Sequence, residues 1–549
     1  MTQTQIDEIK KIFRGDIEND ETTLKTYSND ASLFEIKPQL VVFPRDSEDV
    51  KALVRFVNNT KVTDRTISIT PRSAGTCMSG GSIGTSIIMD FTKYMHVIRE
   101  VTESHATVEP GCFYRDLEKE TLKIKRIMPA FTASKEICAV GGMVANNSGG
   151  EKTIKYGKVE NYIEKLKVVL KDGNEYVVRP LTLTELTQKI TETSFEAEVY
   201  KKIYNLIKEN KKEIDDAKPD VSKNSAGYYL WNVIDKNENF DLCKLIVGSQ
   251  GTLGIVTEIT FKLVPVMPYS NVLAVFMPDI KNLSKIVNEI LPFKPDSLES
   301  YDDYSMKLAV RFFFDFFKQL GFIGAIKLGI KFIPEVIMMA TGGVPKLILL
   351  VEFSDSSEEN VSNKLKEVAD KIKHFDYKMR IASDSEEALK YWKIRRESFN
   401  MLRKHVQGKR TAPFIDDIIV KPEHLPEFLP KIQALLKEYK LIYTIAGHAG
   451  NGNFHIIPLM NLNSPFSADT ILELSKKVYD LVLEYHGSIT AEHNDGIIRT
   501  PYLTQMFGTN IVSLFQKTKD IFDPLNIFNP GKKVGGTFED IRTYIKKKN

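Results

Sequence analysis

The sequence predicts an α+β protein in two parts, and three observations support this class. First, 42% of the 549 residues are hydrophobic and 27% are charged, an ordinary globular composition with ample material for a core. Second, strands and helices alternate up to about residue 265, around three glycine-rich loops. Third, the pattern changes after Pro265 to helical runs between strands, which indicates a separate α+β unit.

The first part begins with a strand, a proline-marked turn and a helix over residues 40–60. Its apolar residues Val50, Leu53, Val54 and Val57 recur at helical spacing. β-Branched residues predict the next strand at 66–70. Further strands are predicted at 85–91, 105–111, 164–173 and 176–180, and residues 244–265 are predicted to form a strand, a glycine turn and a second strand.

The second part begins with a predicted strand at 273–279. Its helical runs lie at 284–291, 361–372 and 425–439, and its other strands at 346–353, 418–422, 441–449 and 454–460. A last helix ends at Asp523-Pro524, because proline cannot continue a helix.

Charge and cysteine content exclude several classes of protein. The 75 Lys and Arg nearly balance 72 Asp and Glu, so nothing favours a nucleic acid partner. The four cysteines form no C-x-x-C pair, which argues against a thiolate zinc site or an Fe–S cluster within this chain, and favours a reducing compartment. The N-terminus has no secretory signal, and charged residues interrupt the apolar stretch 308–350. We therefore expect a cytoplasmic protein without a transmembrane helix.

Three glycine-rich loops stand out: 71–84, 128–157 and 248–258. The first is not a P-loop, because Gly81 stands where that motif needs lysine, and it is not a Rossmann fingerprint, because a strand follows it. On its own it is either an anion nest of backbone N–H groups or a tight surface turn. Three such loops in one α/β region favour the binding of a flat or phosphorylated cofactor.

Histidine is rare in this chain, and three of the nine residues fall in two short segments. His448 and His455 flank a glycine-rich hairpin, and His493 follows Glu492. Two imidazoles and a carboxylate are suitable ligands for a divalent metal. The competing interpretation is that these histidines are core or hydrogen-bonding residues.

The three loops, with VEPG at 108–111 and NPGK at 529–532, resemble the FAD-binding domain of the vanillyl-alcohol oxidase / p-cresol methylhydroxylase (PCMH) superfamily. Within it the chain resembles D-lactate dehydrogenases, the FAD subunits of glycolate oxidases and D-2-hydroxyglutarate dehydrogenases. The resemblance implies a PCMH-type FAD-binding domain of two α/β subdomains, followed by an α+β substrate or cap domain with a ferredoxin-like sheet. The expected boundaries are an N-terminal helical segment at 1–35, the FAD domain at 36–267, the cap domain at 268–500, and a segment at 501–549 that returns to the FAD domain.

The resemblance also implies the residues that hold FAD. The first loop is expected to bind the diphosphate. The FAD cofactor is expected to be non-covalent, because that loop has no histidine and Cys112 is more readily explained as a buried spectator. The expected FAD contacts are Arg72, Ser73, Ala74, Gly75, Thr76, Ser79, Gly80, Pro129, Cys138, Gly142, Ala145, Asn146, Ser148, Gly254, Ile255 and Asn529.

The histidine segments resemble the family motifs GHxGDGNxH and EHGxG. By that match His448, His455 and Glu492 bind a divalent metal, Zn or Mn, and His493 is the catalytic base. Asn451, Asn494 and Asp495 depart from the motifs, and Asn451 removes a negative charge near the expected metal. Three further residues are expected at the substrate: Asn453, which contacts substrate or flavin, and Arg395 and Arg499, which bind its carboxylate.

These parts predict oxidation of a small 2-hydroxy acid to the 2-oxo acid, with the hydride passing to FAD N5 and the hydroxyl proton to His493. The preference for the D-acid is implied by the resemblance alone. The alternatives are a flavin oxidase that uses oxygen, an FAD subunit that acts only with a separate Fe–S partner, and a zinc hydrolase. The electron acceptor stays open among a quinone, an electron-transfer flavoprotein and an Fe–S protein. The apolar segment 312–339 is either a peripheral membrane patch, at the inner face of the membrane, or a buried helical hairpin.

Overall fold

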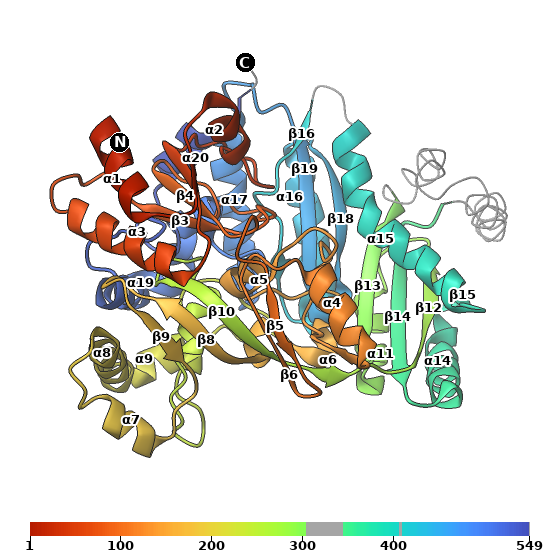
Figure 1. Cartoon of the computed structure of the whole chain (residues 1–549). Coiled ribbons are helices and arrows are strands. Elements are labelled where there is room, and N and C mark those ends of the chain that lie inside the picture. Colours follow the sequence, from red (N-terminus) through yellow and green to blue (C-terminus); the bar gives the residue numbers. More distant parts are fainter. Residues whose placement is uncertain (304–343, 406–408, 548–549) are drawn as a thin grey trace.

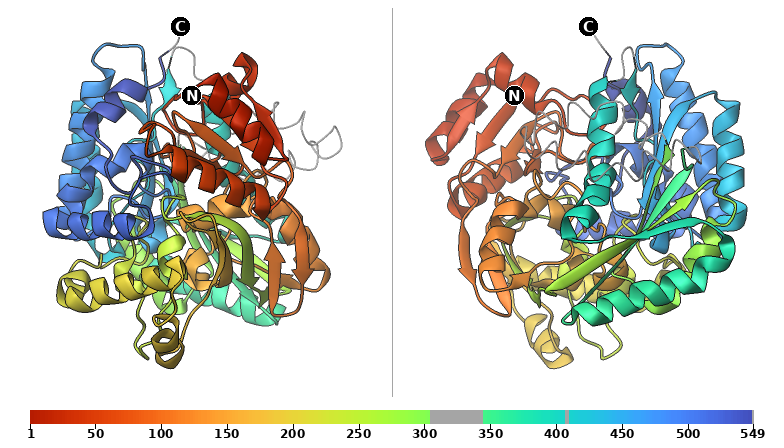
Figure 2. Two further views of the ribbon diagram at one scale, coloured as in Figure 1. Left: turned by 60° about the vertical axis from the view of Figure 1, so that its left-hand side comes forward. Right: turned by 90° about the vertical axis from the view of Figure 1, so that its right-hand side faces the viewer.

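The structure is a computed structural model and describes residues 1–303, 344–405 and 409–547. Two halves lie side by side, one built from the first 265 residues and the other around a large sheet (Figure 1). Figure 2 shows the same arrangement from two further directions, with both termini on the same side of the molecule.

The N-terminal sheet has four strands in the order β1-β2-β4-β3. β2, β4 and β3 are parallel, and β1 pairs with β2 antiparallel. Helices α1 and α3 bury one face of these strands in one core, and the other face packs in a smaller cluster with Leu24 of α2. The segment 1–35, expected to be helical, therefore also supplies an edge strand. The elements are α1 (Gln3–Ile12), β1 (Asp16–Glu18), α2 (Glu21–Tyr27), β2 (Leu40–Phe43), α3 (Ser47–Thr60), β3 (Ile69–Arg72) and β4 (Ile87–Asp90).

The second sheet has five antiparallel strands in the order β5-β6-β10-β8-β9. The strand expected at the start of 244–265 is instead a helical turn, α10, because a short apolar run does not distinguish the two. The strands are β5 (Ile98–Val101), β6 (His105–Val108), β8 (Ile163–Val169), β9 (Glu175–Val178) and β10 (Ile255–Lys262), with a separate pair of β7 (Arg126–Ile127) and β11 (Val264–Pro265). The helices are α4 (Tyr114–Lys123), α5 (Val140–Asn146), α6 (Thr153–Tyr156), α7 (Leu183–Lys189), α8 (Phe195–Glu209), α9 (Lys211–Asp216) and α10 (Cys243–Ile246).

The third sheet has eight strands, in the order β15-β12-β14-β13-β18-β19-β16, with β17 also paired to β19. Among the described residues, β12, α11, β13, β14, α14 and β15 follow one another along the chain, and the four strands are neighbours in the sheet. This β-α-β-β-α-β order confirms the ferredoxin-like sheet. The strands are β12 (Tyr269–Met277), β13 (Ser297–Asp302), β14 (Leu347–Asp355), β15 (Lys378–Ile381), β16 (Arg410–Thr411), β17 (Ile418–Ile419), β18 (Ile442–His448) and β19 (Asn453–Met460).

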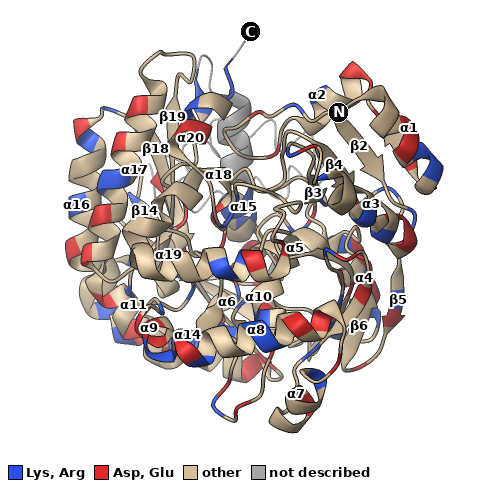
Figure 3. Cartoon of the chain, turned by 90° about the vertical axis from the view of Figure 1, so that its left-hand side faces the viewer, with Lys and Arg blue, Asp and Glu red and all other residues tan. Residues whose placement is uncertain are grey.

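Helices cover both faces of this sheet, so its strands are apolar on both sides. Leu273 and Val275 of β12 join the core under one layer of helices, while Ala274 and Phe276 join the cluster under α15. The helices are α11 (Leu283–Ile290), α14 (Glu358–Ile372), α15 (Ser385–His405), α16 (Leu425–Glu438) and α17 (Ser467–Glu484). In Figure 3, blue and red segments alternate along α8, α16 and α17, so this face of the molecule has no band of one charge.

The C-terminal segment crosses back to the N-terminal sheet. After α18 (Gly496–Arg499) and α19 (Leu503–Phe522), the Asn529 N–H donates to the Ile69 carbonyl at 2.8 Å, beside β3. The chain ends in α20 (Phe538–Tyr544). Among the described residues, no helix has the length and apolar composition needed to cross a membrane. The segment 312–339 lies outside the described residues.

Candidate active site

A cavity of about 470 Å³ lies where the halves meet. The three glycine-rich loops line one part of it, and His448, His455, Glu492 and His493 line another. Both groups of residues that the sequence singled out, far apart in the chain, therefore face the same space.

The first loop connects β3 to β4. Gly75 has a φ of +68°, and a Cβ there would lie 2.3 Å from the Arg72 guanidinium, so the turn needs glycine. Five of the seven residues expected to hold the diphosphate line the cavity; these are Arg72, Ser73, Ala74, Gly75 and Thr76. Ser79 and Gly80 do not line it, because they pack beneath the loop, where the Ser79 carbonyl accepts the Ile497 N–H at 2.8 Å.

The second loop contains a helix that the sequence did not predict, α5. Its glycines face different surroundings: a Cβ on Gly141 would lie 2.7 Å from the Pro110 carbonyl, whereas a Cβ on Gly142 would have no neighbour closer than 3.9 Å. Gly142 thus opens onto the cavity, as close approach of a flat ring requires. The expected contacts Cys138, Gly142, Ala145, Asn146 and Ser148 line the cavity, while Pro129 does not.

Gln250, in the third loop, ties the loops together and was missed by the sequence analysis. Its amide nitrogen donates to Asn146 Oδ1 at 3.2 Å and Ser79 Oγ at 3.3 Å, and its amide oxygen accepts the Gly496 N–H at 2.8 Å. A glutamine in a glycine loop is no sequence signal by itself. These contacts fix the three loops relative to the histidine segment.

Two other expected FAD contacts also need correction, whereas Cys112 agrees with its expected place as a buried spectator. Gly254 lines the cavity, but the neighbouring Ile255 is buried in the core under the N-terminal sheet. Asn529 is buried behind the loops: its amide nitrogen donates to the carbonyls of Gly81 at 2.8 Å and Gln250 at 2.7 Å. Cys112, weighed as a thiol near the flavin, is buried and does not line the cavity.

His448 and His455 lie on adjacent strands, at the end of β18 and the start of β19. Nδ1 of His448 lies 2.7 Å from a carboxylate oxygen of Glu299, and its Nε2 lies 3.2 Å from Glu492. The ring centroids of the two histidines are 5.2 Å apart. A buried carboxylate on one ring nitrogen fixes the tautomer and orients the other nitrogen towards a ligand. Glu299 was not predicted.

Asp416 is a second orienting carboxylate that the sequence analysis missed. It lies 3.1 Å from Nδ1 of His455 and 2.6 Å from Nδ1 of His493, whose rings stack with centroids 5.0 Å apart. The adjacent Asp417 has a φ of +72°, and its carboxylate accepts the backbone N–H groups of Glu492 and His493. Together the two aspartates hold the Glu492–His493 segment in place.

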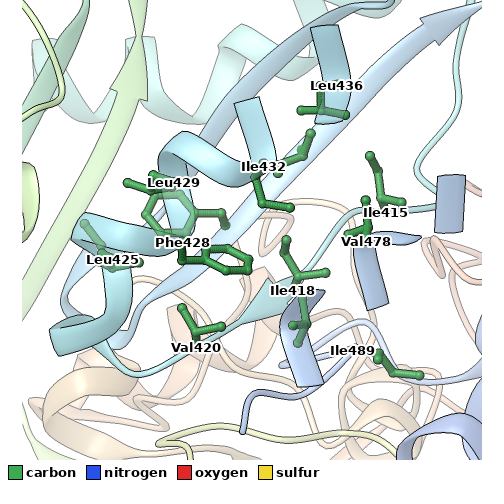
Figure 4. Close-up of a cluster of buried hydrophobic side chains, with 14 of the residues drawn as sticks. Ile415, Ile418, Val420, Leu425, Phe428, Leu429, Ile432, Leu436, Val478 and Ile489 are labelled. Carbon is green, nitrogen blue, oxygen red and sulfur yellow. The ribbon is translucent and has the colours of Figure 1, made fainter. Parts of the chain in front are cut away.

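The aspartate pair rests on a hydrophobic cluster. Ile415 and Ile418, on either side of the pair, pack with Phe428 and Ile432 of α16 and Val478 of α17 (Figure 4). The sequence signal that could have found this pair is two adjacent acidic residues flanked by isoleucines. Isoleucines are usually buried, and carboxylates buried beside them require partners.

The carboxylates set the protonation of the histidines. Burial lowers the pKa of His493, but Asp416 and Asp417 outweigh burial and raise the pKa to about 9. Glu299 and Glu492 similarly outweigh burial at His448 and raise its pKa, whereas burial prevails at His455 and lowers its pKa. His493 is therefore protonated at neutral pH in the absence of a further cation.

The donor atoms fit a divalent metal. One ligand atom each of Asp417, His455, Glu492 and His493 lie within 4.8 Å of one another, and His448 adjoins Glu492. Imidazole nitrogens and carboxylate oxygens suit Zn or Mn. Asp417, absent from the expected ligand set, belongs to this group.

The arginine predictions need one correction. Arg395 lines the cavity and pairs with Glu299 at 3.2 Å. Arg499 does not line it, because its buried guanidinium donates to the main-chain carbonyls of Asp416 and Asn494 and supports the aspartate turn from behind. Asn453, expected at substrate or flavin, is also behind the cavity and donates to Asp417 Oδ1 at 3.1 Å.

Ion pairs join the glycine-loop side to the large sheet. Glu151 accepts two hydrogen bonds from Arg396 of α15, at 2.7 and 2.6 Å. Lys152 pairs with Glu352 at 2.8 Å, and Lys155 with Asp296 at 2.7 Å. They fix the cavity wall that carries Arg395 and Arg396.

Two family models match the chain. The FAD binding domain matches residues 38–179, and the C-terminal domain of FAD linked oxidases matches residues 266–533. With the geometry above, these matches place the protein among flavoproteins. The chain therefore carries an FAD binding domain followed by the C-terminal domain of FAD linked oxidases.

Its curated relatives are hydroxy-acid dehydrogenases. The chain is 26% identical to a D-2-hydroxyglutarate dehydrogenase of Pseudomonas putida, over 95% of this chain and 50% of that protein, so it spans about half the length of the first such relatives. It is 26% identical to a D-2-hydroxyglutarate dehydrogenase of Stutzerimonas stutzeri, with 96% and 98% coverage of the two chains, and 27% identical to a D-lactate dehydrogenase of Archaeoglobus fulgidus, with 90% and 91%.

Solved structures share the fold. A 4-ethylphenol oxidase from Gulosibacter chungangensis superposes with a TM-score of 0.69 at 15% identity, over 98% of both chains. p-Cresol methylhydroxylase superposes with a TM-score of 0.67 at 16% identity, also over 98% of both chains. The expected PCMH-type fold is thereby confirmed.

Proposed function

We propose that the protein is an FAD-dependent dehydrogenase that oxidises a D-2-hydroxy acid of the D-lactate, glycolate or D-2-hydroxyglutarate type to the 2-oxo acid. One observation carries the proposal: glycine-lined backbone and a histidine–carboxylate cluster share one cavity. A substrate bound between the glycine-rich loops and the histidine–carboxylate cluster would contact both groups. The names of the curated relatives support the substrate class.

The residues present fit both cofactors. Arg72 to Thr76, Gly142 and Asn146 would hold a non-covalent FAD. His455 and Glu492, with the adjoining His448, would hold a divalent metal. When bound, FAD supplies a hydride acceptor, and the metal ion supplies a Lewis acid for the substrate hydroxyl.

His493 handles the hydroxyl proton. Asp416 holds Nδ1, which leaves Nε2 as the nitrogen that exchanges a proton with substrate. Without a metal, Asp416 and Asp417 keep the His493 ring protonated. Beside a bound divalent metal, protonation of the ring would be less favourable and Nε2 would be free to act as a base.

Arg395 positions the substrate. Its guanidinium faces the cavity beside the histidine cluster, and Glu299 holds it through one nitrogen. A carboxylate on the substrate matches the planar donors of arginine. The next residue, Arg396, is held in place by Glu151.

The test is anaerobic reduction of the bound flavin. Purified protein is mixed with D-lactate, L-lactate, glycolate and D-2-hydroxyglutarate, with and without prior treatment with a chelator. We expect a D-acid to bleach the flavin band near about 450 nm, with bleaching slowed by chelation. His493→Gln abolishes bleaching, and His96→Gln, at an exposed histidine, does not.

The outcomes separate the alternatives. Bleaching that survives complete metal removal contradicts the metal role, and absence of bleaching by every acid contradicts the substrate class. Rapid reoxidation in air identifies an oxidase, whereas slow reoxidation supports transfer to a separate acceptor such as a quinone, an electron-transfer flavoprotein or an Fe–S protein.

A further inference from the structure

Lys223 is a fully buried cation directly behind the predicted metal ligand. Its side chain has no exposed surface, and its ammonium is ion-paired with Glu492. It also lies 3.4 Å from the Asn453 amide oxygen. Lys223 does not line the cavity, whereas Glu492 does. The ammonium therefore contacts the carboxylate from the protein side.

Lys223 and His448 contact the same oxygen of Glu492. The Lys223 ammonium is bonded to Oε1, and His448 Nε2 lies 3.2 Å from that atom. A carboxylate buried without a cation is strongly destabilised. Lys223 supplies a positive charge on the protein side of Glu492, and this ion pair holds the carboxylate in place before any metal arrives.

That charge also acts on a metal. A lysine ammonium in contact with a ligand carboxylate withdraws charge from the ligand and repels a divalent ion a few ångströms away, and this repulsion is strong where water is excluded. Asp417, by contrast, is held by the backbone N–H groups of Glu492 and His493, which carry no net charge.

We propose that Lys223 is a positioning residue that holds Glu492 in the metal-free protein and lowers the affinity of the site for a divalent metal, so that the ion exchanges with solution. This inference rests on the metal site of the proposed function. Removal of the ammonium leaves Glu492 with only the His448 imidazole beside the same oxygen, and a metal ion then replaces the missing charge.

The test compares Lys223→Met with the wild-type FAD-loaded full chain. The Zn²⁺ and Mn²⁺ dissociation constants are measured by competition with a chelator of known affinity, and the melting temperature is measured with and without metal. We expect metal affinity to rise at least about tenfold, with a lower melting temperature without metal and a larger increase on adding it.

Lys158→Met is the matched control. Lys158 is also buried, but its ammonium contacts uncharged groups: Ser225 Oγ at 2.6 Å, Tyr229 Oη at 3.3 Å and main-chain carbonyls, including that of Ala491 at 2.9 Å. This variant should also lose stability, but its metal affinity should rise less than that of Lys223→Met, because its ammonium does not contact Glu492 and acts on it only from a distance.

Two further variants cover the case in which Lys223→Met does not fold. Lys223→Arg keeps the charge and should keep the weak wild-type affinity. The double variant Lys223→Met/Glu492→Gln removes both charges and should fold without metal and bind little of it.

Equal or weaker metal affinity in Lys223→Met overturns the inference, and so does a stronger affinity in Lys223→Arg. If wild type binds no metal but Lys223→Met does, the inference stands and the metal half of the proposed function fails. If neither binds metal, both fail. Flavin reduction by a D-2-hydroxy acid tests the remainder of the function independently.

Discussion

The Asp416 carboxylate lies 2.6 Å from Nδ1 of His493 and, through its other oxygen, 3.1 Å from Nδ1 of His455. One buried carboxylate thus orients two stacked imidazoles. Such partners of functional histidines typically contribute 10–100-fold to activity or metal affinity.

We expect Asp416→Asn to lower kcat/KM for the preferred acid by about 10- to 100-fold. It should also lower the pKa of His493 from about 9, because the main charge that raises it is lost. The pKa is measured by NMR of histidine-labelled, metal-free protein. Glu100→Gln serves as the control, because Glu100 pairs with the partly exposed His105 at 3.2 Å, away from the cavity. An unchanged His493 pKa in Asp416→Asn would contradict the role given to Asp416.

The stability of the metal-free protein should depend on pH through His493. A group whose pKa is raised on folding stabilises the fold below its unfolded pKa of about 6.5, and this contribution disappears as pH rises through the folded value. The free energy of unfolding of wild type, relative to His493→Gln, should therefore fall between about pH 6.5 and 9. Denaturant titrations at pH 6, 7.5 and 9 measure it. A relative stability that rises over this range would show that the sign is wrong.

Neighbouring glycines of α5 should respond in opposite ways to alanine. Gly142→Ala should stabilise the FAD-free protein by about 0.5–1 kcal/mol, because alanine favours a helix and the site has room. The same methyl group projects into the cavity, so FAD affinity should fall at least about tenfold. Gly141→Ala should destabilise the fold, because its Cβ would lie 2.7 Å from the Pro110 carbonyl. Denaturation and flavin-fluorescence titration measure both quantities. Unchanged FAD affinity in Gly142→Ala would place the cofactor elsewhere.

The pair of Glu151 and Arg396 should matter more than surface pairs. Glu151→Gln removes the buried carboxylate that holds the partly buried Arg396 and should reduce the free energy of unfolding by about 1–3 kcal/mol. It should also raise KM for the acid, since Arg396 adjoins Arg395. Asp215→Asn, at an exposed helix pair, should change stability by less than about 0.5 kcal/mol. Equal effects of the two substitutions would show that the buried pair contributes no more than a surface pair.

Patterns of apolar residues predicted many of the strands and several helices, but not the long helices α8, α15 and α17. Val50, Leu53 and Val57 form the buried face of α3, as expected from their spacing. The same patterns did not identify the conformation of two short segments. The apolar run before Gly248 is the helical turn α10, and the glycine-rich run at Gly141 lies in α5. In both cases tertiary packing outweighs local preference.

The site was also predicted only in part, because only some of its residues lie in recognisable motifs. His448, His455 and His493 carry a sequence signature and do converge on the cavity. The residues that orient or charge them, such as Glu299 and Lys223, have no signature, since a single acidic or basic residue is most often on the surface. Only the packed fold brings these residues next to the histidines.

The hydrogen bond from Thr70 to Asn529, 3.1 Å long, joins residues that are 459 positions apart. A ribosome that adds about 5–20 residues per second needs roughly half a minute to a minute and a half to synthesise the chain between them. The first glycine loop therefore leaves the exit tunnel long before the segment that locks it. Insertion of a flavin that needs the complete first loop therefore has to wait until the segment around Asn529 has been synthesised, and the growing chain carries an unsealed nucleotide cradle until then.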